Sequence, residues 1–163
     1  MVYLPEQRGV FPDLSVIDNL RMSVRSDRSK TERQRRVEMV LEMFPALASR
    51  RKQGAGTLSG GEQQMLALAG ALSMDPKVLV GDELSLGLAP IVVDTVFETF
   101  EKAKQSGMVI VVIEQYVHRA LELADSAIIL QRGEIAWAGK TGVAKDEVLR
   151  RYLDTSTELG VVP

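Results

Sequence analysis

The sequence of 163 residues contains no cysteine. This absence excludes disulfide bonds and thiolate-bound metals, so the fold does not depend on an oxidising compartment. No apolar run reaches the ~18 residues needed to cross a membrane, and the first residues lack the basic and apolar parts of a secretory signal. We therefore expect a cytoplasmic protein that reaches a membrane only through a partner.

Neither sign of charge is in strong excess, since 20 basic residues stand against 22 acidic ones. The stretch from Arg21 to Arg36 is locally basic, and a solvated helical face is its simplest explanation. We predict no nucleic-acid partner. With 45% apolar and 26% charged residues, the composition is typical of a soluble globular domain with a packed core.

The first half of the sequence has the pattern of a loop followed by helices. Ser15 is placed to cap a short helix that runs through Leu20, and a second amphipathic helix is predicted to stop near Pro45. A third helix, long and mostly buried, is predicted from Glu62 to about Met74. The apolar positions of the second helix are Val37, Val40, Leu41 and Phe44.

The second half alternates between strands and helices. Two β-branched runs, Val78–Asp82 and Met108–Ile113, are typical of parallel strands buried on both faces, and a helix that begins at Pro90 joins them. We predict an α/β fold, with a mainly parallel sheet flanked by helices and an N-terminal helical subdomain. The remaining predicted elements are a helix near Val117–Ala124, a hairpin with arms Ala127–Leu130 and Ile135–Ala138 around Arg132-Gly133, and a closing helix with Val148, Leu149 and Tyr152.

The segment Leu58–Gln64, Leu-Ser-Gly-Gly-Glu-Gln-Gln, has the chemistry of an anion site. Gly60 and Gly61 let the backbone approach an anion closely. A helix that begins directly after them points free N–H groups and its positive dipole end at the same place. Ser59 adds a hydroxyl donor. The simpler alternative is that Ser59 only caps the helix beside a turn.

Two segments in this order resemble those of the ABC-type ATPases. Leu58–Gln64 resembles the signature loop of that family, and Val78–Glu83 resembles its Walker B strand. The resemblance implies a partial P-loop NTPase (ABC) domain that works with ATP and Mg²⁺. The phosphate loop Gly-x-x-x-x-Gly-Lys-Ser/Thr, which precedes these segments in the family, does not occur in the 163 residues.

The resemblance implies a role for each residue of these segments. Asp82 would hold Mg²⁺ at the end of its strand, and Glu83 would polarise the attacking water. For this Asp-Glu pair, an ordinary strand-to-loop transition remains the alternative. The signature loop would complete the ATP site of a second ABC ATPase subunit in a head-to-tail dimer. The residues implied in that nucleotide contact are Ser59, Gly60, Gly61 and Glu62.

Two further segments resemble loops of the same family. Tyr3–Pro12 resembles the Q-loop region, in which Glu6 or Gln7 would sense nucleotide and relay its state to integral membrane permease subunits. A plain connector is the alternative. Ser85–Pro90 resembles the D-loop, which packs against its counterpart in the dimer, and it also suits the start of a helix.

Gln115 stands where most relatives carry the switch histidine. Its amide can donate a hydrogen bond to a phosphate oxygen but takes up no charge near neutral pH. The resemblance therefore makes Gln115 a catalytic residue whose function is insensitive to histidine titration. The single histidine, His118, is predicted to be a partly exposed helix residue.

The combination of motifs is similar to the ATP-binding subunits of branched-chain amino-acid importers, from residue 1 to about 141. It implies one partial ABC ATPase domain, 1–163, with a helical subdomain at about 12–75, an α/β core at 76–141 and a C-terminal helix and tail at 142–163. The chain would be the C-terminal portion of a subunit that couples ATP binding and hydrolysis to transport at the inner face of the cell membrane. The alternatives are a non-catalytic module that completes the ATP site of an intact partner, and a soluble ABC protein of repair or translation, which usually carries two cassettes or long coiled coils.

The sequence departs from the family pattern at three positions near these motifs. Leu84 replaces the proline that usually follows the catalytic glutamate, Gly81 interrupts the Walker B strand, and Gly70 replaces an arginine in the helix after the signature. We expect Gly70 to cost about 1 kcal/mol of helix stability and Gly81 to weaken strand packing.

A near match to the phosphate loop occurs around Gly133 and Gly139–Thr141, but five residues separate its glycines where the motif requires four. The residues between are predicted to form a strand, which cannot wrap a phosphate. We therefore expect the chain alone to bind ATP weakly. We also expect exposed sheet edge and apolar surface, and with them self-association or low stability.

Overall fold

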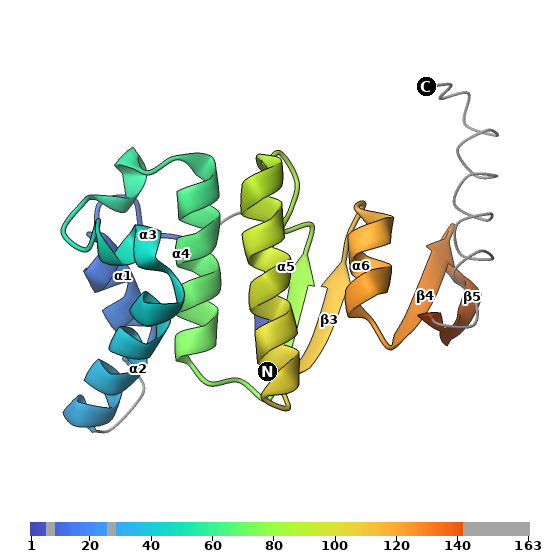
Figure 1. Cartoon of the computed structure of the whole chain (residues 1–163), viewed down its shortest axis with the longest axis horizontal. Helices are drawn as coiled ribbons and strands as arrows, with labels where there is room; N and C mark the ends of the chain where they lie inside the picture. Colours follow the sequence, from blue (N-terminus) through green and yellow to red (C-terminus); the bar gives the residue numbers. More distant parts are fainter. Residues whose placement is uncertain (6–8, 26–28, 142–163) are drawn as a thin grey trace. The chain divides into compact units, whose positions relative to one another are not determined.

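The computed structural model describes residues 1–5, 9–25 and 29–141. These residues belong to two compact units, 1–115 and 116–163 (Figure 1). The nucleotide-sensing positions proposed for Glu6 and Gln7 and the predicted closing helix lie outside the described residues.

A three-stranded parallel sheet forms the α/β part of the first unit. Its strands are β1 (Val2–Leu4), β2 (Val78–Asp82) and β3 (Val109–Ile113), in the order β1-β2-β3. Both pairings are parallel, and the predicted helix that begins at Pro90 joins β2 to β3. The sequence did not predict β1, because three residues are too few to show a period-2 pattern and their partner β2 is more than 70 residues away.

Six helical segments complete the described part of the first unit. Two of them, α1 and α5, begin where the sequence predicted: Ser15 accepts a hydrogen bond from the Asp18 N–H at the start of α1, and Pro90 lies in the first turn of α5. Pro45 ends one helix and begins the next. The segments are α1 (Val16–Ser23), α2 (Lys30–Met43), α3 (Pro45–Ala48), the 3-10 turn η1 (Ala55–Thr57), α4 (Gly60–Ser73) and α5 (Pro90–Gln105).

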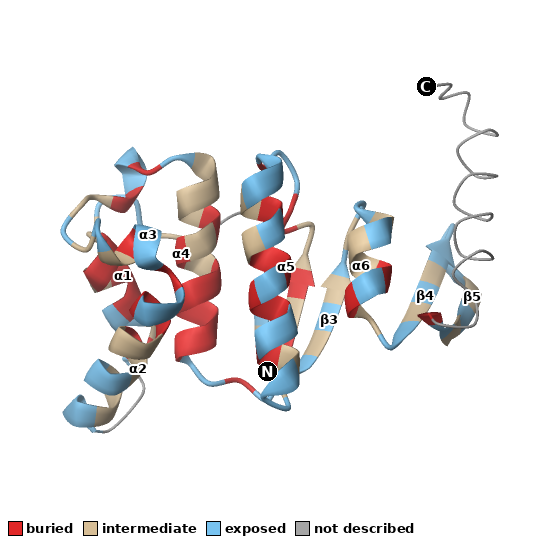
Figure 2. Ribbon diagram, in the orientation of Figure 1, coloured by how far each residue is buried: buried red, intermediate tan, exposed pale blue. Residues whose placement is uncertain are grey.

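Helix α4 is the central element of the first unit. It contacts α1, α2 and α3 on one side and β1 and α5 on the other, so it joins the helical subdomain to the sheet (Figures 1 and 2). Gly70 lies where α4 meets α1, and a Cβ built on it would be 2.7 Å from the Ser23 hydroxyl oxygen. The glycine therefore permits close helix packing, which offsets its low helix propensity.

The side chain of Leu84 fills the space that Gly81 leaves open. A Cβ built on Gly81 would lie 2.7 Å from Leu84 Cδ1 and 3.5 Å from Phe100 Cζ. Leu84 is 2% exposed and Phe100 is fully buried. The expectation that Gly81 weakens packing is therefore wrong, because a residue three positions later fills the space.

Alternate residues of β3 are exposed. Val109, Val111 and Ile113 are 56%, 46% and 50% exposed, so the prediction that this strand is buried on both faces is wrong for one face. Within the described residues, no strand of the first unit pairs with the outer edge of β3. This is the apolar edge and surface that the sequence led us to expect.

The second unit contains helix α6 (Val117–Leu123) and an antiparallel hairpin of β4 (Ser126–Gln131) and β5 (Glu134–Lys140). The two turn residues, Arg132 and Gly133, both have positive φ, as a tight hairpin turn requires. The predicted hairpin is confirmed, and so is the exposure of His118 on α6. The near match to a phosphate loop is strand from Glu134 onward, as the spacing indicated.

None of the helices in the described residues is both long and apolar enough to cross a lipid bilayer.

Candidate functional site

The signature segment forms the start of α4. Ser59 is the N-cap residue, its side chain accepts a hydrogen bond from the Glu62 N–H at 3.3 Å, and the Glu62 carboxylate accepts one from the Ser59 N–H at 2.8 Å. This reciprocal pair is a capping box. The helix therefore begins at Gly60, two residues earlier than predicted, and both glycines lie in its first turn.

A second contact anchors Glu62. Arg50, just beyond α3, places its Nε 2.9 Å from Glu62 Oε1. The pKa of Glu62 lies below its usual value, mainly because its carboxylate accepts the Ser59 backbone N–H, with the Arg50 charge acting in the same direction. Glu62 thus stays ionised and ties the signature turn to the helical subdomain. The sequence offered no signal for Arg50.

The glycines of the signature leave backbone N–H groups available. Within the described residues, no acceptor meets the N–H of Gly60 or Gly61. A Cβ on Gly61 would lie 2.9 Å from a methyl carbon of Val92 on α5, so packing also requires glycine at that position. Ser59 is exposed and both glycines are half-buried, which leaves this turn at the surface.

Asp82 is the last residue of β2. Its carboxylate accepts a hydrogen bond of 2.8 Å from the hydroxyl of Tyr3 on β1. The parallel register sets Tyr3 beside Val80, two residues before Asp82 and on the same face of the sheet. The Asp82 hydrogen bond raises the pKa of Tyr3, so its hydroxyl remains a donor. Sequence reasoning missed Tyr3, because only the pairing of β1 with β2 brings it to the acid.

The side chains of Glu83 and Gln115 are in direct contact. Gln115 Nε2 donates to Glu83 Oε1 at 3.2 Å. Glu83 has a φ of 48°, a left-handed backbone that costs a non-glycine residue about 1–2 kcal/mol. Its N–H donates to the carbonyl of Ile113 at 2.8 Å, which holds this conformation. The turn after β2 therefore aims one predicted catalytic side chain at the other.

Glu114 joins the same group of residues. Its Oε1 accepts the N–H of Ser85 at 3.2 Å and its Oε2 accepts the Ser85 hydroxyl. Burial raises the pKa of Glu114 above its usual value, against the opposing Ser85 hydrogen bonds and with a further increase from the charge of Glu83. Glu114 was not predicted as a site residue, although an acid directly after an apolar strand and before Gln115 was the available signal.

The two groups of predicted site residues remain separate. Within the described residues, no hydrogen bond or ion pair links the signature residues Ser59–Glu62 to Asp82, Glu83 or Gln115. Asp82 accepts a hydrogen bond from Tyr3, and Glu83 accepts one from Gln115. The chain therefore presents one surface made by a helix start and another made by strand ends.

The acid group fits Mg²⁺ held together with phosphates, but not a cage made by protein alone. Within the described residues, no cluster of three or more histidine, cysteine, aspartate or glutamate side chains is placed to hold a metal. Mg²⁺ typically takes one or two carboxylates and completes its shell with water and phosphate oxygens. Asp82, whose carboxylate carries one neutral hydroxyl partner, suits that arrangement.

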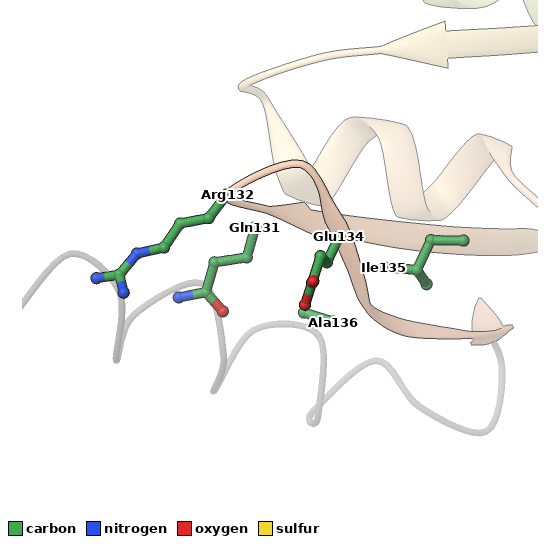
Figure 3. A pocket seen from close by; sticks show the side chains of 5 residues that line it. All are labelled: Gln131, Arg132, Glu134, Ile135 and Ala136. Carbon is green, nitrogen blue, oxygen red and sulfur yellow. The ribbon is translucent and has the colours of Figure 1, made fainter.

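A shallow hollow of about 260 Å³ lies at the hairpin of the second unit (Figure 3). It contains none of the predicted site residues. Its lining includes both an arginine and a glutamate, Arg132 and Glu134, so it has no marked preference for an anion or a cation. The described residues that line it are Gln131, Arg132, Glu134, Ile135 and Ala136.

Comparison of sequences yields one family match and a set of close relatives. The family model described as "ABC transporter" matches residues 1–85, just over half of the chain. The "High-affinity branched-chain amino acid transport ATP-binding protein BraG" of Pseudomonas aeruginosa is 46% identical over 132 residues, which are 81% of this chain and 56% of the relative. The "Probable branched-chain amino acid transport ATP-binding protein LivF" of Archaeoglobus fulgidus is 39% identical over 85% of this chain and 59% of the relative. The chain thus spans less than two thirds of the length of both.

Comparison of structures gives the same fold. An ATP-binding cassette solved as a dimer in a post-hydrolysis state with ADP and Pi superposes with a TM-score of 0.75 at 24% identity, over 85% of this chain and 62% of the other. An ATP-binding subunit of an ABC transporter gives a TM-score of 0.76 at 25% identity, over 91% and 62%.

The capped glycine turn, the acid pair after an apolar strand and the adjoining switch glutamine thus occur within a fold shared with solved ATP-binding cassettes. These features and the family match lead to one conclusion: the chain belongs to the ABC transporter family and has a partial P-loop NTPase fold of the ABC type.

Proposed function

We propose that this chain supplies the signature, Walker B and switch segments of an ATP-binding subunit that couples ATP binding and hydrolysis to branched-chain amino-acid transport. The observation that carries the proposal is the contact between Gln115 Nε2 and Glu83 Oε1 beside Asp82, separate from the capped turn at Ser59. The transport names of the 46% and 39% identical relatives support the substrate class.

At the acid group, Asp82 would hold Mg²⁺, which when bound neutralises charge on the phosphates. Glu83 is the general-base candidate, because Gln115 occupies its Oε1 and no described residue occupies its Oε2. Gln115 orients that carboxylate by donating one amide hydrogen, and its other amide hydrogen is free to reach a phosphate oxygen. Tyr3 donates to Asp82 and keeps its carboxylate turned toward the strand end.

At the signature turn, the helix cap and an anion contact are compatible. The Ser59 oxygen accepts the Glu62 N–H in the cap, while its hydroxyl hydrogen remains available as a donor. With the N–H groups of Gly60 and Gly61, it forms a set of donors at the positive end of a 14-residue helix. We propose that these donors meet the terminal phosphate of ATP held by a second subunit in a head-to-tail dimer.

In this proposal the helical subdomain of residues 12–75 presents the signature to the partner subunit. Integral membrane permease subunits then hold the assembly at the inner face of the cell membrane. The nucleotide-sensing role of Glu6 or Gln7 is part of the same proposal, carried over from the family motif.

A second candidate function is a helper that completes the ATP site of an intact partner without hydrolysing ATP itself. The observation in its favour is that, in the part of the chain that the structure describes, no hydrogen bond or ion pair links the capped turn at Ser59 to the acid group. The two candidates assign the same role to Ser59 and different roles to Glu83. A helper requires the signature turn alone, whereas a hydrolysing subunit also requires its own acid group.

The test is steady-state ATP hydrolysis by a phosphate-loop-bearing relative mixed with this chain. We expect the chain to raise the rate of the relative and Ser59→Arg to abolish the increase, because the longer cationic side chain blocks the donors. Ser106→Arg, which adds the same side chain at an exposed serine just after α5, is the matched control and should keep the increase. Equal effects of the two arginine variants would refute the signature role. Glu83→Gln then separates the candidates: a lower rate favours hydrolysis by this chain, and an unchanged rate favours the helper.

A further inference from the structure

The end of β3 is bonded to the turn after β2 at three consecutive residues. The Ile113 carbonyl accepts the Glu83 N–H at 2.8 Å, and Gln115 Nε2 donates to Glu83 Oε1 at 3.2 Å. Between them, the Glu114 carboxylate accepts both the N–H and the hydroxyl of Ser85. Two segments about 30 residues apart are thus connected by four hydrogen bonds, and Glu114 accepts two of them.

Ser85 is the buried end of this connection. It is fully buried, so its hydroxyl and N–H have no water to replace a lost partner. The residues that follow it, Leu86 and Gly87, are exposed, and Gly87 has a φ of 69°. Fixing Ser85 therefore fixes the point from which the chain turns outward to the surface, only two residues after Glu83.

We propose that Glu114 is a positioning residue of this site: its carboxylate holds Ser85 and thereby sets both the backbone of Glu83 and the exposed turn at Leu86-Gly87. This inference rests on the proposed function, which gives Glu83 and the exposed turn at Leu86-Gly87 their roles. The bonding itself is a property of the first unit alone.

The chemistry of Glu114 favours this role over simple packing. A neutral side chain could accept the Ser85 hydroxyl without the cost of placing a carboxylate in a half-buried position near a second one. The raised pKa of Glu114 reflects this cost. Its carboxylate in turn accepts two charge-assisted hydrogen bonds from one residue, Ser85, and such bonds are stronger than those to a neutral acceptor. Bidentate acceptance also restricts Ser85 in two directions, which a single hydrogen bond does not.

The first test measures amide hydrogen exchange by NMR on the full chain. Glu114→Ala removes both acceptors, and we expect exchange at the Glu83 and Ser85 amides to rise about tenfold or more while amides of α4 stay unchanged. Glu114→Gln keeps one acceptor oxygen, so it should restore most of the protection. Glu101→Ala, at an exposed position on α5, is the matched control. A role limited to packing would raise exchange across the whole unit, and no rise at Glu83 would equally refute the inference.

A second variant covers the case in which Glu114→Ala does not fold. Ser85→Ala removes only the hydroxyl and leaves the N–H bonded to Glu114. We expect it to raise exchange at Glu83 less than Glu114→Ala does, and to shift the side-chain amide resonances of Gln115. Unchanged Gln115 resonances in Ser85→Ala would contradict the connection.

The second test uses the mixed hydrolysis assay, because there the two proposals fail differently. We expect Glu114→Ala to raise the chain concentration needed for half-maximal stimulation about tenfold, with Glu114→Gln close to the original chain. If Ser59→Arg has no effect, the proposed function fails whatever Glu114 does. If Ser59→Arg abolishes stimulation and Glu114→Ala changes nothing, only the positioning role fails.

Discussion

Gly81 and Leu84 occupy one space between β2 and α5, and this arrangement makes a stability prediction. In Gly81→Ala, the new Cβ would lie 2.7 Å from Leu84 Cδ1 and 3.5 Å from Phe100 Cζ. Neither neighbour can move into solvent, since they are 2% and 0% exposed. Overpacking of this kind costs about 1–3 kcal/mol, and the loss of glycine flexibility returns up to about 1 kcal/mol. We predict a net loss of about 1–2 kcal/mol.

The reverse change tests whether the two positions share that space. Leu84→Ala removes a buried side chain and should cost about 2–5 kcal/mol, as for other leucines in cores. In Gly81→Ala with Leu84→Ala, the methyl group at 81 enters the space vacated at 84. We therefore expect the double variant to be more stable than the sum of the single changes predicts, by about 1–2 kcal/mol.

Urea unfolding of the four chains measures this coupling, at a protein concentration low enough that dilution no longer shifts the midpoint. The control pairs Gly81→Ala with Leu47→Ala, a fully buried residue on α3 outside this cluster, and should be additive. Additivity within about 0.5 kcal/mol for the Gly81 and Leu84 pair would refute the shared-space argument. A Gly81→Ala chain more stable than the original would refute it as well.

Three further predictions concern charge, exposed surface and capping. Burial and the Glu83 charge raise the pKa of Glu114, so the folded state loses stability as pH rises above 4.5, the usual pKa of a glutamate. The melting temperature of Glu114→Gln relative to the original chain should therefore increase from pH 4.5 toward neutral pH. A difference that stays constant with pH would contradict the raised pKa. Val111→Lys should increase the monomer fraction in sedimentation, because it places a charge on the exposed apolar face of β3. Ile91→Lys, at an exposed position on α5, should not. Equal monomer fractions in the two variants would show that this face of β3 does not drive association. Ser59→Ala should cost about 1 kcal/mol in urea unfolding and Ser59→Asp should recover it, because the cap accepts one N–H; an unchanged midpoint in the alanine variant would count against the cap.

Local sequence patterns were enough to predict most elements of the fold. The Ser15 cap, the start of α5 at Pro90 and the turn at Arg132-Gly133 are each determined by residues within one turn of the feature they specify. The spacing of β-branched residues likewise located β2 and β3 within one residue of their bounds. These features depend on contacts close in sequence, which periodicity and turn chemistry report directly.

Two contacts at the candidate site that the sequence did not predict depend on strand pairing across the fold. Tyr3 reaches Asp82 only through the register of β1 on β2, and Glu114 reaches Ser85 only because β3 lies beside β2. Asn19 was not predicted for a different reason, since its partners lie close in sequence. It is 6% exposed, accepts the Phe11 N–H and donates to three carbonyls of the segment that leads into α1. No local pattern separates such a residue from an ordinary polar position on a helix.

The three departures from the family pattern each lie at a closely packed position in the structure. Gly70 lies where a Cβ would come within 2.7 Å of the Ser23 oxygen, and Gly81 lies where Leu84 fills the missing side chain. Both glycines thus have close neighbours, and neither position leaves an empty space beside the backbone. Leu84, whose buried side chain lies against Gly81, directly follows Glu83. The same contact therefore fixes the direction of the backbone after Glu83, the proposed catalytic acid.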